Sequence, residues 1–129
     1  MTRALVAFIA TARSQDAIPF YRDVLGLELV EETPFAAVLR SGTTVVRLQK
    51  VEALTPQPFT ALGWDVSDLR AALAELRRHG VSCERYGFMQ QDDDGVWAAP
   101  GGALVAWFKD PDGNLLSYSQ PPTTEENAR

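Results

Sequence analysis

Histidine and cysteine are almost missing from this chain of 129 residues, which contains one of each. The single Cys83 can neither form a disulfide within the chain nor build a thiolate metal cluster. The chain also lacks a basic cluster, since 17 acidic residues outnumber 12 basic ones and give a formal net charge of −5. A protein that reads duplex nucleic acid normally presents a basic face, so nucleic acid is excluded as the expected partner.

Long apolar runs are missing too, because no stretch approaches the roughly 18 residues that a membrane-spanning helix needs. The amino terminus runs straight into a strand-like segment, without the charged region, apolar region and cleavage site of a signal peptide. We therefore expect a cytoplasmic protein. Hydrophobic residues make up 46% and charged residues 22% of the chain, the usual mixture for a globular domain.

The first half of the sequence predicts a strand, a helix and three further strands. A continuous apolar run over 4–10 is typical of a buried strand. Ser14 is a candidate cap for the following helix, Pro19 suits an irregular or later start, and Gly26 can end it in a left-handed conformation. Turn residues then separate three short strands, predicted over 27–31, 35–39 and 43–49.

The second half repeats this order after a proline-rich hinge over 53–58. A strand is predicted over 59–66, followed by a helix that Ser67 or Asp68 caps and Gly80 ends. Four strand-like segments follow over 81–86, 96–98, 104–108 and 115–119, one more than the first half has. A tight turn over 110–114 joins the last two.

This order predicts an α+β fold in one domain over 3–120, with a frayed polar tail over 121–129. Two paired β-α-β-β-β modules, over 3–52 and 59–120, would form a half-open concave sheet with a trough on the face away from the helices. Periodicity alone leaves an ordinary α+β sandwich without a trough as an alternative.

Two motifs resemble those of a known family. The run Phe20–Leu27 is similar to the "FYxdvLGL" signature of the vicinal oxygen chelate superfamily, and Asp110–Asn114 matches its "DPDGN" turn. That superfamily holds glyoxalase I, extradiol dioxygenases, fosfomycin-resistance enzymes and bleomycin-resistance proteins. The resemblance implies the glyoxalase/bleomycin resistance/dioxygenase fold of paired β-α-β-β-β modules, and it leaves the function open because the superfamily hosts several chemistries.

The resemblance also implies where a divalent metal would bind. The family's usual ligands, one His and one Glu from each module, fall here on Val6, Arg47, Ala61 and Ser117. A register shift of one residue offers Ala7, Leu48, Leu62 and Tyr118, which are no better. Only Gln49 and Asp65, further along the same faces, could donate oxygen. We therefore expect an erased metal site and no cofactor.

The remaining candidates for chemistry have structural interpretations that we favour. His79 ends the second helix, where a cation complements the helix dipole. The run Asp92–Asp94 lacks the other ligands of a calcium loop and is typical of a solvated turn. Cys83 is expected to be a small core residue, and Asp110 and Asp112 to shape their turn by local side-chain bonds.

Strand alternation then predicts the residues that line the trough. Arg47 would be its only charge, half-buried and in need of an acceptor such as Gln49, a carboxylate or a bound anion. Small residues would open space around it, and Trp97 would line a pocket from a loop, whereas Trp64 and Trp107 are expected in the core or at a dimer contact. The predicted substrate-binding residues are Arg47, Gln49, Ala61, Gly63, Trp97 and Ser117.

We therefore expect a metal-independent protein that binds a small organic molecule, in the manner of bleomycin-resistance-type proteins. One alternative is a lyase, isomerase or dioxygenase relative with a displaced metal or none, and another is a regulatory domain with a vestigial trough. The ligand's charge stays open, because the acidic balance favours a neutral or cationic compound and Arg47 favours an anionic group. Similar members of the superfamily commonly pair their modules between chains, so a homodimer is expected.

Overall fold

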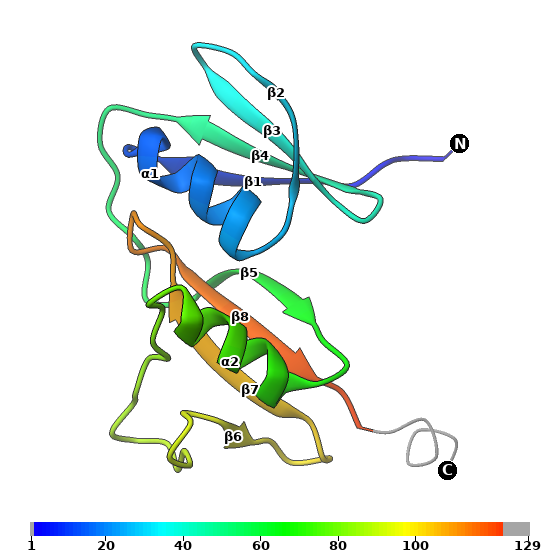
Figure 1. Ribbon diagram of the computed structural model, residues 1–129, viewed down its shortest axis with the longest axis vertical. Coiled ribbons are helices and arrows are strands. Elements are labelled where there is room, and N and C mark those ends of the chain that lie inside the picture. The colour runs from blue at the N-terminus through cyan, green and yellow to red at the C-terminus, as the bar shows by residue number, and fades with distance from the viewer. Residues whose placement is uncertain (1, 123–129) are drawn as a thin grey trace. The chain divides into compact units, whose positions relative to one another are not determined.

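The computed structural model describes residues 2–122, which form two compact units (Figure 1). The first unit runs to Ala61 and includes Asp110–Asn114, and the second comprises Leu62–Lys109 and continues from Leu115. Most of the tail predicted over 121–129 lies outside the described residues. No helix of the described part is long and apolar enough to cross a membrane.

The first unit contains a four-stranded sheet in the order β1-β4-β3-β2. Strand β1 (Val6–Thr11) is parallel to β4 (Thr44–Lys50), whereas β3 (Ala36–Ser41) is antiparallel to both β4 and β2 (Glu28–Glu32). The sheet is shown in blue to green in Figure 1. These bounds confirm the four strands predicted in the first half, with shifts of one or two residues at their ends.

The helix between β1 and β2 begins as α1 (Ser14–Pro19) and continues as a π-helical turn, η1 (Phe20–Val24). The expectation that Ser14 caps this helix is wrong, because the backbone carbonyl of Arg13 accepts from the N–H groups of Asp16 and Ala17 at 2.9 and 2.8 Å. Pro19 lies at the end of α1 and not in its first turn. Since proline has no N–H to donate, the helix widens directly after it.

The second unit repeats the arrangement with a sheet in the order β5-β8-β7-β6. Its strands are β5 (Thr60–Asp65), β6 (Trp97–Ala98), β7 (Leu104–Lys109) and β8 (Leu115–Gln120), and its helix is α2 (Leu69–Arg78). Asp68 caps α2 by accepting from the N–H of Ala71 at 3.1 Å, as predicted. The apolar stripe predicted for this helix is the core of the unit, with Leu69, Leu73 and Leu76 at most 2% exposed.

The strand predicted over 81–86 is absent, and the side chain of Gln91 takes its place as a hydrogen-bonding partner. Within this segment, the backbone N–H of Glu84 donates to the carbonyl of Trp107 on β7 at 2.7 Å, and no ladder of such bonds forms. The Gln91 amide accepts from the N–H of Tyr86 and donates to the carbonyls of Glu84 and Gly95. The second module is therefore strand–helix–three strands, and the predicted α+β fold of two such modules is confirmed.

The two sequence motifs meet inside the first unit. The hydroxyl of Tyr21, which is fully buried, donates to Asp110 Oδ2 at 2.7 Å. The same carboxylate accepts from the Asn114 side chain and, at Oδ1, from the N–H groups of Asp112 and Asn114. Burial raises the pKa of Asp110 above its usual value, and the donors around it oppose that rise. Asp110 therefore shapes its turn as predicted and also ties it to the helix.

Asp112 acts over a longer range than we predicted. Its carboxylate accepts from Thr11 Oγ1 at 2.5 Å and from the N–H of Ala12 at 2.9 Å, and so binds the turn to the end of β1. Asn114 adds a third tie by donating to the carbonyl of Ala10 at 2.9 Å. Gly113, at a φ of 88°, permits the turn that brings these groups together.

We expect Tyr21→Phe to lower the free energy of unfolding by about 1–3 kcal/mol, because it removes one donor from a buried carboxylate without changing the packing. Tyr118→Phe is a matched control, since the Tyr118 hydroxyl has no hydrogen bond to a described residue. It should change stability by less than about 0.5 kcal/mol. Urea unfolding of both variants measures the difference, and equal losses would contradict the assignment.

Candidate functional site

Each sheet has one face covered by its helix and one face turned away from it, which we call its distal face. On the first sheet, the buried residues Val46, Leu48 and Leu39 alternate with residues that point the other way. The strand register places these in rows across the sheet. The distal face of the first sheet consists of Val6, Phe8, Ala10, Ala36, Val38, Arg40, Val45, Arg47 and Gln49.

Arg47 lies in the middle of this face between two apolar neighbours, Phe8 on β1 and Val38 on β3. Its guanidinium carbon lies 5.8 Å from the centroid of the Phe8 ring, within reach of a cation–π interaction. The expectation of a half-buried arginine is wrong, because Arg47 is exposed. Among the described residues, no carboxylate pairs with it, and Asp65 is not its partner.

Gln49 follows Arg47 on the same face, two residues along β4. Its cross-strand neighbours are alanines on both sides, Ala10 on β1 and Ala36 on β3. Such small neighbours leave space beside the amide. Gln49 is exposed and makes no side-chain hydrogen bond to a described residue.

The distal face of the second sheet is built from small residues beside aromatic ones. Gly63 on β5 lies against Ser117 on β8, so that a Cβ added at Gly63 would be 2.6 Å from Ser117 Oγ. Trp107 on β7 is the cross-strand neighbour of Ser117 on the other side. Ala61 precedes Gly63 by two residues and is exposed on the same face.

Ser117 is only 9% exposed, yet its hydroxyl makes no hydrogen bond to a described residue. No fully buried side-chain oxygen or nitrogen of the described part lacks a partner. The Ser117 hydroxyl must therefore reach solvent, and it is available to a molecule bound on this face.

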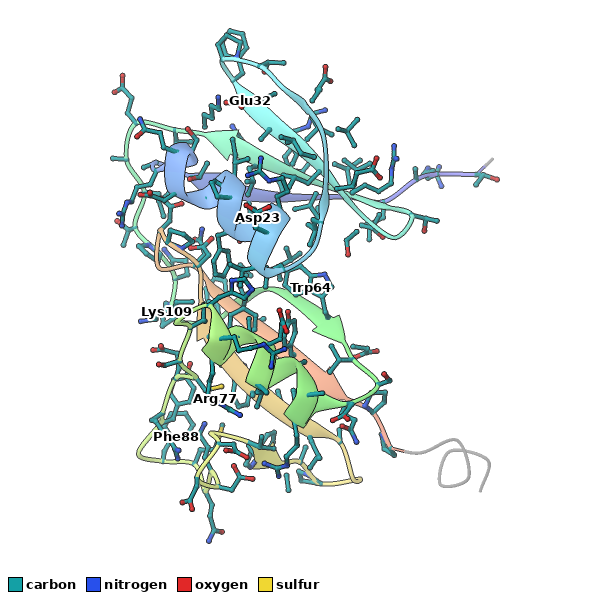
Figure 2. The ribbon with its side chains drawn as sticks, viewed as in Figure 1. Asp23, Glu32, Trp64, Arg77, Phe88 and Lys109 are labelled. Atoms are coloured by element: carbon teal, nitrogen blue, oxygen red, sulfur yellow. The ribbon has the colours of Figure 1, made fainter. Side chains whose placement is uncertain are left out.

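A row of aromatic rings continues the same face toward the edge of the sheet. Trp97 and Trp107 lie 6.1 Å apart between ring centroids, Trp107 and Tyr86 lie 5.8 Å apart, and Tyr86 and Phe88 lie 5.6 Å apart. Phe88 is 85% exposed on the loop before β6 (Figure 2). These distances suit aromatic contacts between neighbouring rings.

Trp97 belongs to the short strand β6, inside the strand-like segment predicted over 96–98, so the expectation that it lies in a loop is wrong. It lines a cavity of about 410 Å³ within the second unit, together with Arg70, Gln90, Val96 and Leu104. Trp64 is partly buried and packs edge-on against Tyr118, with ring centroids 6.1 Å apart. Trp107 differs from it by pointing to the distal face.

The four positions that would hold the superfamily's metal do not fit a divalent cation. Val6 and Arg47 lie on the distal face of the first sheet, and neither offers an oxygen or imidazole donor. Ala61 and Ser117 lie on the distal face of the second sheet, where the only donor is a neutral hydroxyl. No group of three or more His, Cys, Asp or Glu residues in the described part could hold a metal ion.

The other polar candidates have structural partners. Arg70 pairs with Asp92 and Asp94 at 2.7 and 2.8 Å, and this contact holds the pKa of Asp92 below its usual value. His79 follows the end of α2 and lies 3.4 Å from Glu75. Burial raises the pKa of Cys83, which packs against Gly95 and is a poor nucleophile at neutral pH.

Sequence reasoning grouped these aromatic residues near the trough but missed the contact of Phe8 with Arg47 and the ring-to-ring contacts of Tyr86 with Trp107. The alternation of Phe8 with Ile9 and of Trp107 with Phe108 was a usable signal for the face, since each pair divides between the two sides. No local sequence pattern indicated the strand register, which decides which residues are cross-strand neighbours.

We expect Gly63→Ala to destabilise the second unit by about 1 kcal/mol, because the added Cβ displaces the Ser117 hydroxyl. Ser117→Ala alone should be nearly neutral, within about 0.5 kcal/mol, since no described residue bonds that hydroxyl. The double variant should recover most of the loss. A double-mutant cycle from urea unfolding measures this coupling, and simple additivity would contradict the contact.

Comparison with known proteins agrees with this architecture. The family model for the Glyoxalase/Bleomycin resistance protein/Dioxygenase superfamily matches residues 4–118. No curated protein matches the chain significantly in sequence.

Three solved structures share the fold at low identity. A bleomycin resistance determinant encoded on the transposon Tn5 has a TM-score of 0.73 at 19% identity, covering 95% of this chain and 100% of its own. TnmS3, an antibiotic binding protein from Streptomyces sp. CB03234, has a TM-score of 0.71 at 20% identity, covering 95% and 98%. Lactoylglutathione lyase from Agrobacterium tumefaciens has a TM-score of 0.71 at 18% identity, covering 93% and 94%.

At these identities the likeness concerns the fold, and together with the family model it confirms the resemblance of the two motifs. The chain belongs to the Glyoxalase/Bleomycin resistance protein/Dioxygenase superfamily.

Proposed function

We propose that this chain binds a small organic molecule without the help of a metal ion. The observation that carries the proposal is the set of residues at the four metal-ligand positions, which are Val6, Arg47, Ala61 and Ser117. A divalent ion needs imidazole or carboxylate donors there, and an arginine repels it. Binding energy must then come from hydrogen bonds and apolar contact with the protein itself.

The distal faces supply both kinds of contact. Arg47 and Gln49 on the first sheet are exposed polar groups whose side chains have no hydrogen bond or ion pair with a described residue. Ser117 on the second sheet has an available hydroxyl beside Gly63, and Trp97 offers ring surface. We propose as ligand contacts the residues Arg47, Gln49, Ala61, Gly63, Trp97 and Ser117.

Solved structures with the same fold support the proposal that this chain binds an organic molecule. Two of the structures with this fold are described as a bleomycin resistance determinant and an antibiotic binding protein, so that the fold is compatible with capture of an organic molecule. Another is described as a lyase, and an enzyme with this fold is the competing function. The absence of suitable ligands at the four positions favours binding over metal-assisted catalysis.

Binding should be insensitive to chelator. We expect native mass spectrometry of gently purified protein to show a small-molecule adduct that survives EDTA, and elemental analysis to find no stoichiometric zinc, nickel, manganese or iron. The melting temperature should also be unchanged by EDTA, because no bound metal contributes to stability. About one metal ion per chain, or turnover that returns with added metal, would favour the enzyme.

We also propose that the chain forms a homodimer. Strands β1 and β5 are terminal strands of their sheets, and such edges invite pairing with another chain. Light scattering at micromolar concentration should give twice the chain mass of 14.2 kDa. A monomer mass at that concentration would contradict this proposal without affecting ligand binding.

A further inference from the structure

We propose that the ligand of this protein is a small organic anion, bound on the distal face of the first sheet by Arg47, and that Phe8 is the residue that positions the guanidinium. This inference rests on the proposed function and deepens it, because it fixes the charge of the bound molecule. All the residues of this site belong to the first unit.

The pairing of charges on the first sheet sets Arg47 apart. Arg40, on the same face, lies 3.5 Å from Glu28, its cross-strand neighbour. Lys50, on the same strand as Arg47, lies 2.7 Å from Glu32. Arg47 alone among these three cations has no carboxylate partner in the described residues.

The neighbours of Arg47 explain why its charge is uncompensated. Phe8 and Val38 occupy the two directly opposed positions, where β1 and β3 could otherwise have carried an acidic residue. Glu31 lies one strand further away, opposite Val38. In a chain with a net charge of −5, an unpaired cation with apolar residues on both sides marks a place for an added negative charge.

Phe8 also contacts the guanidinium of Arg47 with its ring. Its ring is 62% exposed and lies 5.8 Å from the guanidinium carbon of Arg47. A cation–π contact restrains the long side chain and leaves its N–H donors unused. The guanidinium is thereby presented to a ligand with less loss of rotamer freedom on binding.

The chemistry around this pair fits a carboxylate with an apolar body. A guanidinium binds a carboxylate through two parallel hydrogen bonds. Gln49 lies two residues along β4 on the same face, roughly 7 Å away by strand geometry, and its amide can bond a second polar group. Phe8 and Val38 offer apolar surface, and Ala10 and Ala36 leave room beside Gln49.

Benzoate and benzamide are a matched pair of probes for this proposal, since they share a ring and differ in charge. We expect benzoate to shift the Nε–H signal of Arg47 in nitrogen-15 NMR saturably, at millimolar concentration and low salt. Benzamide should bind about 5- to 10-fold more weakly, because it lacks the charge-assisted hydrogen bonds. The Arg40 signal is the internal control and should move little.

Three substitutions separate positioning from structure. Arg47→Met should abolish the preference for benzoate and leave the melting temperature unchanged, whereas Arg40→Met should keep the preference. Phe8→Leu should weaken benzoate binding about 2- to 5-fold, the equivalent of an exposed cation–π contact. Phe8→Tyr keeps a ring and should restore the affinity, which a purely structural role of Phe8 would not predict.

Two outcomes would overturn the proposal. One is an Arg47 signal that benzoate moves no more than the Arg40 signal, and the other is equal affinity for benzamide and benzoate. Either result leaves the proposed function standing if an EDTA-resistant adduct is still seen by native mass spectrometry. Absence of both an EDTA-resistant adduct and a benzoate response at Arg47 would contradict the proposed function as well.

Discussion

The buried carboxylate of Asp110 is the group on which the first unit depends. It stays inside the protein because four donors surround it, among them the hydroxyl of Tyr21 and the side chain of Asn114. A buried carboxylate that lost these donors would be strongly destabilising, so the helix and the turn must be held together. Residues 89 positions apart in the sequence are joined in this way. The two motifs that identify the superfamily are thus the two halves of one hydrogen-bonding network.

The division of each sheet into two faces separates stability from function. Helices α1 and α2 cover one face of their sheets and bury residues such as Leu48 and Leu116, which form the cores. The other face is left to carry whatever chemistry the chain performs. In this chain, Arg47 and Ser117 on those faces stand at two of the positions where the resemblance places the superfamily's metal ligands.

Local pattern was enough to predict much of the fold. Alternating apolar residues gave the strands and their faces, and capping residues such as Asp68 and Gly80 marked the ends of α2. The residues at the four positions that the resemblance assigns to metal ligands could also be read directly, because this needs only residue identity. Local pattern wrongly predicted a side-chain cap at Ser14, where the backbone carbonyl of Arg13 accepts the first N–H groups of the helix. It also wrongly predicted a strand over 81–86, where the Gln91 side chain bonds the backbone in place of a neighbouring strand.

The sequence by itself determined the order of the elements, the apolar stripes and the charge of the chain, since these depend on residues close together in the chain. Only the tertiary structure decided which residues become neighbours across the sheet. The parallel register of β1 on β4 brings Phe8 beside Arg47, and the return of residues 110–114 to the first unit brings Asp110 to Tyr21. Both pairings join distant segments, and no local preference encodes them, because register is set by packing of the whole face.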